Sequence, residues 1–180
     1  MRKFTFGPPL VLQGRKWKGL RGWAGKPFHP PLTDVPVTAY LMAGVFDVLS
    51  MARDSVSLRE AATYVLLFGA AVSLLAALTG WADWHRSSEV GTQARRTINA
   101  HAVIMITVTV LVLADIAVRL GEDGTSTGLM TVLSVLAAAL VSVGATYGGS
   151  LVYDYGFNVE TAGDHPVWHK SEEDVYPGKH

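Results

Sequence analysis

Histidines are the side chains of this sequence whose type and position best suit chemistry. Three of the six lie beside long apolar segments: His29 precedes the first, His85 ends the second and His101 opens the third. Imidazole nitrogens bind haem iron and other metal ions, and they exchange protons near neutral pH. A fold that gathers these segment ends would place the three rings in one polar layer.

Such a layer has several possible uses. Two of the imidazoles, His101 with His85 or His29, could ligate the iron of haem b on its two axial faces. The layer could instead bind a quinone headgroup through hydrogen bonds from His, Tyr and Trp, or the histidines could be structural and cap helix ends. The spacing of Asp83 and His85 is weaker evidence for a metal ion site.

Charged residues inside the apolar segments form a second group. Asp115 follows His101 by fourteen residues, which returns it to within about 40° of the same helix face. Because an acid that faces lipid costs several kcal/mol, Asp47 and Asp115 should face the interior of a bundle. Arg119 stands i,i+4 to Asp115, and Arg53 is a candidate partner for Asp47. A proton or ion pathway through the two acids is the alternative to these ion pairs.

Four apolar segments must position these residues, and they run over 36–52, 61–84, 98–120 and 128–153. Each is near the ~20 residues that cross a ~30 Å hydrocarbon core, and the first is the shortest. Charged residues are 17% of the chain, below the roughly 25% usual in soluble domains. A soluble bundle of buried helices is the alternative, but the middle segments have little of the polar face that it needs.

The connections after the first and third segments are short, which makes consecutive helices antiparallel. The sequence therefore predicts an all-α, up-down-up-down transmembrane four-helix bundle. Twelve of the fifteen Lys and Arg residues fall on the side that holds the N-terminus, the middle loop and the C-terminus, and all six histidines fall there too. The positive-inside rule places that side in the cytoplasm.

Composition divides the chain into three parts. Residues 1–28 form an extended basic arm, with Trp17 and Trp23 among Lys and Arg, which suits either the lipid headgroup region or a disordered tail. Residues 29–159 form the transmembrane domain, and residues 160–180 form an acidic tail suited to docking on a partner. The sequence has no cysteine, so this chain ligates no iron–sulfur cluster. Nothing besides the arm supports nucleic-acid binding.

Four motifs together resemble a bacterial family of four-helix integral membrane domains of unknown function. The motifs are His29-Pro30, Thr79-Gly80-Trp81-Ala82-Asp83-Trp84, His101 and Gly148-Gly149-Ser150-Leu151-Val152-Tyr153-Asp154-Tyr155-Gly156. The resemblance covers residues 29–159 and implies a multi-pass protein of the bacterial cytoplasmic (inner) membrane. Some relatives are fused to Rieske-type iron–sulfur domains, which implies a redox setting. Tyr153, in the last motif, joins the three histidines as a candidate cofactor contact.

The residues and the resemblance together predict a membrane subunit of a respiratory or redox complex that contributes to electron transfer. Its histidine layer would bind haem b or contact quinone, and its partners would be the lipid membrane and other subunits of the complex. No nucleophile–base pair or phosphate-binding loop marks the chain as an enzyme by itself. The alternative is a non-catalytic scaffold or accessory subunit with structural histidines.

Overall fold

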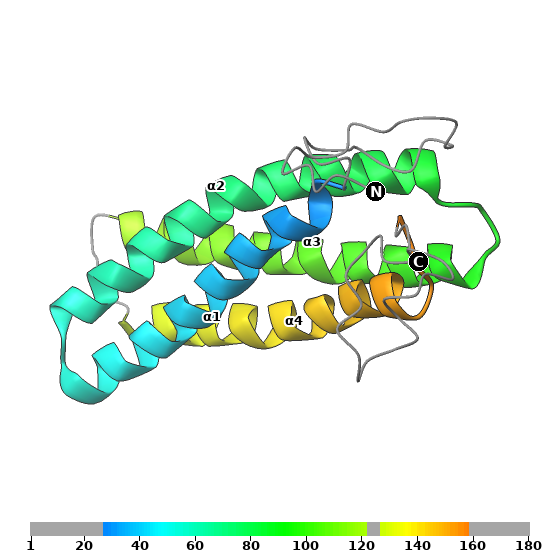
Figure 1. The fold of residues 1–180 in the computed structure, drawn as a ribbon. Coiled ribbons are helices and arrows are strands. Elements are labelled where there is room, and N and C mark those ends of the chain that lie inside the picture. The colour runs from blue at the N-terminus through cyan, green and yellow to red at the C-terminus, as the bar shows by residue number, and fades with distance from the viewer. Residues whose placement is uncertain (1–26, 122–126, 159–180) are drawn as a thin grey trace, which may run out of the picture.

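Four helices make up the part of the chain that the structure, a computed structural model, describes, residues 27–121 and 127–158. They are α1 (His29–Arg53), α2 (Val56–Ser87), α3 (Gln93–Leu120) and α4 (Thr127–Tyr153). Consecutive helices run antiparallel (Figure 1), and each is long and apolar enough to cross a membrane. The predicted up-down-up-down bundle is confirmed. Nearly all of the basic arm and of the acidic tail, including His165, His169 and His180, lies outside the described residues.

The start of α1 differs most from the apolar pattern, which placed it at Pro36. The helix begins at His29 because Pro30 and Pro31 occupy its first turn, where the N–H groups that proline lacks have no helical partner. Pro36 lies buried inside the helix. With 25 residues, α1 is therefore long enough to span the membrane, although its apolar segment is the shortest of the four.

Hydroxyl side chains define where α2 and α3 begin. Ser55 accepts a hydrogen bond from the Leu58 N–H at 3.4 Å, and Thr92 accepts one from the Arg95 N–H at 3.1 Å. Such caps satisfy N–H groups that have no partner within the helix. Both helices therefore start several residues before their apolar segments, in sequence that suits the polar edge of a membrane.

In the bundle, α1 lies diagonally opposite α3, and α2 lies diagonally opposite α4. α1 packs against α2 and α4, α3 packs against α4, and the interface between α2 and α3 is the smallest of the four. Within the described residues the backbones of α1 and α3 do not approach each other closely, nor do those of α2 and α4. The centre of the bundle is apolar and fully buried, and its largest members are Tyr40, Leu66, Val108, Val112 and Val141. A contact across this centre therefore joins side chains from two diagonal helices.

Small residues allow the close approach of α1 to its neighbours. A Cβ atom on Gly69 of α2 would lie 2.7 Å from the Cβ of Ala39 on α1 and 3.0 Å from Cε1 of Tyr40. On the other side of α1, a Cβ on Gly44 would lie 3.2 Å from the Cβ of Ala138 on α4. This packing role is the usual one for small residues in membrane helices.

Replacing Gly69 by Ala should destabilise the bundle, because the added methyl group would overlap Ala39 and push α1 from α2. We expect the free energy of unfolding to fall by about 1–3 kcal/mol, the range for an overpacked core. The measurement is reversible unfolding in detergent micelles, followed by circular dichroism. Gly128→Ala is the matched control, because a Cβ there meets nothing within 4 Å. Equal stability of the two variants would contradict the tight α1–α2 contact.

Candidate functional site

His29 and His101 lie next to each other at one end of the bundle. Their ring centroids are 6.4 Å apart and their ring planes meet at 85°. His29 is the first residue of α1, whereas His101 lies in the third turn of α3. Because these helices are diagonal, the two rings meet across the centre of the bundle. The structure thus brings together two of the three histidines expected in the polar layer.

Each ring of this histidine pair is held by a backbone carbonyl of a neighbouring helix. Nδ1 of His29 lies 2.8 Å from the carbonyl oxygen of Ala76 on α2, and Nδ1 of His101 lies 2.8 Å from that of Gly144 on α4. A carbonyl oxygen only accepts hydrogen bonds, so both Nδ1 atoms must carry the proton. Nε2 of each neutral ring then keeps its lone pair, the state in which imidazole binds a metal.

Glycines provide the space that the two rings occupy. A Cβ on Gly80 of α2 would lie 2.7 Å from Cε1 of His29, and a Cβ on Gly148 of α4 would lie 3.3 Å from Cε1 of His101. A side chain at Gly80 would therefore displace the His29 ring. Two glycines of the sequence motifs thus have a physical role, which is to admit the histidines between the helices.

The other predicted cofactor contacts lie away from the pair. His85 is exposed and stacks on Trp81, with ring centroids 5.8 Å apart and planes at 9°. Tyr153, at the end of α4, is 88% exposed. The interior site therefore consists of His29 and His101 and leaves His85 and Tyr153 at the surface. Across residues 27–121 and 127–158, no group of three or more His, Cys, Asp or Glu side chains could hold a metal ion.

A second polar site, near the opposite end of the bundle, centres on Arg119 of α3. Its Nε donates to Oδ1 of Asp115, one turn earlier, at 2.9 Å, and its Nη2 donates to Oδ2 of Asp47 on α1. Its Nη1 donates to Oγ1 of Thr63 on α2 at 3.2 Å. The side chains of Arg119 and Asp47 are each 2% exposed, and that of Asp115 is 0% exposed. One guanidinium therefore links three helices inside the apolar bundle.

The partners in this charged cluster differ from expectation at one residue. Asp115 and Arg119 form the i,i+4 pair that their spacing predicts. The cation that reaches Asp47 is also Arg119, whereas Arg53, the expected partner, is exposed at the end of α1. Asp47 and Asp115 face each other from diagonal helices, so one long guanidinium satisfies both. An unpaired carboxylate in hydrocarbon is costly, so burying Asp47 and Asp115 favours an arrangement in which both contact Arg119.

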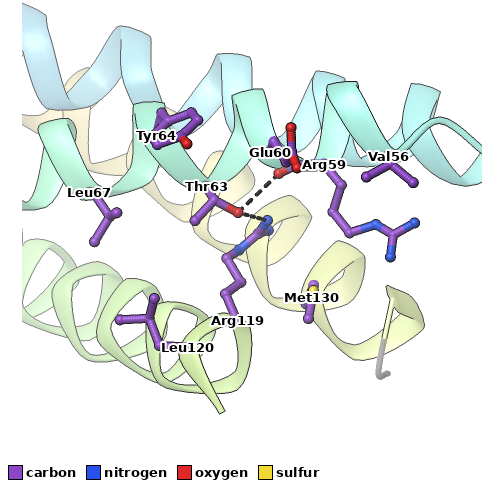
Figure 2. A pocket seen from close by; sticks show the side chains of 9 residues that line it. All are labelled: Val56, Arg59, Glu60, Thr63, Tyr64, Leu67, Arg119, Leu120 and Met130. Carbon is purple, nitrogen blue, oxygen red and sulfur yellow. Dashed lines mark hydrogen bonds between the residues drawn. The ribbon is translucent and has the colours of Figure 1, made fainter. Parts of the chain in front are cut away.

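A cavity of about 360 Å³ opens beside this cluster (Figure 2). Its lining comprises Val56, Arg59, Glu60, Thr63, Tyr64, Leu67, Arg119, Leu120 and Met130. These residues come from α2, from the end of α3 and from the start of α4. The cavity therefore follows the α2–α3 interface, where the helices pack least. Nε of Arg59 is buried in this region without a hydrogen-bond partner.

Some contributors to these sites carry little signal in the sequence. The acceptors at Ala76 and Gly144 are backbone carbonyls, which every residue has. Thr63 was not singled out, although a hydroxyl within an apolar helix is a polar group that needs a partner. Its Oγ1 donates to the Arg59 carbonyl at 3.0 Å and accepts from Arg119. Pairing hydroxyls with charged residues at similar depth would have found this contact.

The fold and its two polar sites define a class of protein. It is a four-helix integral membrane protein with paired imidazoles at one end and a buried arginine–aspartate cluster near the other. The chain belongs to the family described as "Predicted membrane protein (DUF2231)", which matches residues 25–161. The family resemblance inferred from the motifs is thereby confirmed, and the match includes both sites. No curated protein and no solved structure matches the chain.

Replacing Arg119 by Met should strongly destabilise the protein, because Asp47 and Asp115 would be left without their cation. We expect the free energy of unfolding in detergent micelles to fall by about 3–5 kcal/mol, as for other broken buried ion pairs. Adding Asp47→Asn and Asp115→Asn to this variant should restore much of the loss, since no buried charge then lacks a partner. Arg53→Met, at an exposed position, should change little. Wild-type stability of Arg119→Met would show that the cluster is dispensable.

Proposed function

We propose that the protein is a membrane subunit of a redox complex in which His29 and His101 are the axial ligands of a haem b. The observation that carries this proposal is the hydrogen bonding of the two rings. Both Nδ1 atoms donate to backbone carbonyls, which leaves both Nε2 lone pairs for iron. A histidine that binds a metal ordinarily donates its other ring N–H in this way.

The separation of the rings also fits this ligand set. Two imidazoles that would hold one iron atom between them must lie close together, on either side of a shared point. The observed separation of His29 and His101 is 6.4 Å. These two residues, which diagonal helices supply from opposite sides of the bundle axis, would therefore hold the haem iron between them.

The haem and the residues of the chain would have different roles at such a site. When bound, haem would supply a one-electron carrier within the membrane. The chain's own residues would hold it, with the carbonyls of Ala76 and Gly144 fixing the tautomer and orientation of each imidazole. Electron exchange requires partner subunits, and an iron–sulfur partner would be another polypeptide, since this chain has no cysteine.

The same geometry favours haem over the quinone headgroup considered from the sequence. A quinone carbonyl needs a hydrogen-bond donor, whereas each neutral ring has already used its only N–H on a backbone carbonyl. Binding to iron through Nε2 would leave both of these hydrogen bonds in place. In the scaffold alternative the histidines are structural and no group is bound. The absorption spectrum distinguishes this alternative from the haem proposal.

The absorption spectrum of the purified protein tests the proposal. Protein isolated in mild detergent from cells that make haem should show a Soret band and, after reduction, an α-band in the b-type region. His29→Ala and His101→Ala should each remove most of this absorbance, because each variant loses one axial ligand.

The control for the spectrum is His85→Ala, since His85 is exposed and stacks on Trp81 away from the pair. This variant should keep the wild-type spectrum. Wild-type protein without a Soret band would exclude the haem proposal. Bands that persist in both His29→Ala and His101→Ala would exclude this ligand assignment.

We also propose the bacterial inner membrane as the location, with both termini and the histidine pair on the cytoplasmic side. The support is the charge bias, since twelve of the fifteen Lys and Arg residues fall on that side. Seven of those twelve belong to the N-terminal arm, which carries most of the bias.

Labelling of single cysteines tests this orientation cleanly, because the natural chain has none. Glu89→Cys places a thiol between α2 and α3, and Ser57→Cys places one at the start of α2; both positions are exposed. A membrane-impermeant maleimide should label Ser57→Cys in intact cells and Glu89→Cys after lysis. The reverse pattern would overturn the orientation.

A further inference from the structure

The cavity beside the charged cluster combines a cation with apolar walls. Arg59 lies in the first turns of α2, and the apolar side chains of Val56, Tyr64, Leu67 and Leu120 continue the lining. Figure 2 shows the Arg59 guanidinium extending away from Thr63 and Arg119, toward the side of the cavity where Val56 and Met130 lie. A ligand that fills this space must therefore offer a group for a guanidinium and also an apolar part.

Arg59 lacks a partner in its surroundings. Its Nε is buried without a hydrogen bond, and its side chain forms no ion pair within the described residues. Arg119 is different, because Asp47, Asp115 and Thr63 already accept from its guanidinium. The charge available to a ligand in this cavity is thus that of Arg59. A guanidinium in a membrane protein without a carboxylate partner is suited to a phosphate group.

The depth of the cavity matches the edge of a bilayer. α2 has 32 residues, hence a length of about 48 Å, which exceeds the ~30 Å of hydrocarbon. Because its apolar segment begins only at residue 61, its first turns, with Arg59, extend to the headgroup region. Leu67 lies eight residues further along α2, or about 12 Å deeper, where acyl chains are found. Going deeper into the membrane, the lining of the cavity changes from polar to apolar. A lipid changes in the same order, from its headgroup to its acyl chain.

The carboxylate of Glu60, which also lines the cavity, limits the kind of ligand that can bind. Glu60, next to Arg59, is exposed at the rim of the cavity. Its carboxylate repels anions, and this disfavours doubly charged inorganic phosphate more than the singly charged phosphodiester of a phospholipid. The apolar walls add affinity that only a ligand with hydrocarbon can use.

We infer that this cavity is a binding site for a phospholipid, with the phosphodiester against Arg59 and an acyl chain along Tyr64, Leu67 and Leu120. The lipid fills the α2–α3 interface where the two helices pack least. The site lies at the end of the bundle opposite the histidine pair, so it does not depend on what that pair binds.

Native mass spectrometry of the full-length protein, released from detergent with increasing dioleoyl phosphatidylglycerol, tests this site. Wild-type protein should show one saturable lipid adduct. Arg59→Gln should bind roughly tenfold more weakly, as expected for loss of a hydrogen bond to a charged group. Arg53→Gln is the matched control, because it removes an exposed arginine from the same end of the bundle. This control should bind as the wild type does.

Two further ligands identify the recognised group. Dioleoylglycerol, which lacks the phosphate, and inorganic phosphate, which lacks the chains, should both bind more weakly than the phospholipid. Equal binding of either one would overturn the inference, as would equal lipid affinity of Arg59→Gln and the wild type. Should Arg59→Gln fail to fold, the comparison of ligands on the wild-type protein decides, because it needs no substitution and equal binding of dioleoylglycerol or inorganic phosphate would overturn the inference.

Discussion

Hydrocarbon cannot hydrogen-bond, and this constraint determines how the protein uses His29, His101 and Arg119 inside its bundle. A buried donor or charge must find its partner on another part of the protein. His29 and His101 find theirs on backbone carbonyls of neighbouring helices, and Arg119 finds two carboxylates and a hydroxyl. All of these contacts except the Arg119–Asp115 pair, which lies within α3, join different helices. The polar groups that are most expensive to bury therefore also fix how the helices are arranged.

The two ends of the bundle achieve this with different chemistry. At one end neutral rings are held by hydrogen bonds, and glycines on α2 and α4 make room for them. Near the other end a single guanidinium is shared between charges from α1 and α3 and a hydroxyl from α2. Between them lies an apolar centre that includes Leu66, Val108 and Val141. Apolar side chains thus separate the two polar sites. A substitution in one site therefore removes no direct contact of the other.

Much of the fold was predictable because membrane insertion is governed by simple rules of length and hydropathy. The helix pattern also predicts the Asp115–Arg119 pair, which is local. The structure places His85 at the surface, apart from His29 and His101, and helix geometry contains the reason. Gly80 faces His29, and five residues further along an α-helix is about 140° around its axis. The pairing of Asp47 with Arg119 depends on the relative depth of α1 and α3, which the spacing within one helix does not specify.

The histidine contacts contain a repeated pattern. His29 bonds to the carbonyl of Ala76, and Gly80, four residues on, receives its ring; His101 bonds to the carbonyl of Gly144, and Gly148, again four residues on, receives its ring. The hairpin of α1 and α2 and the hairpin of α3 and α4 thus contribute the same three parts. The centre of the site is therefore pseudo-symmetric, because each hairpin surrounds its imidazole with an equivalent carbonyl and an equivalent glycine.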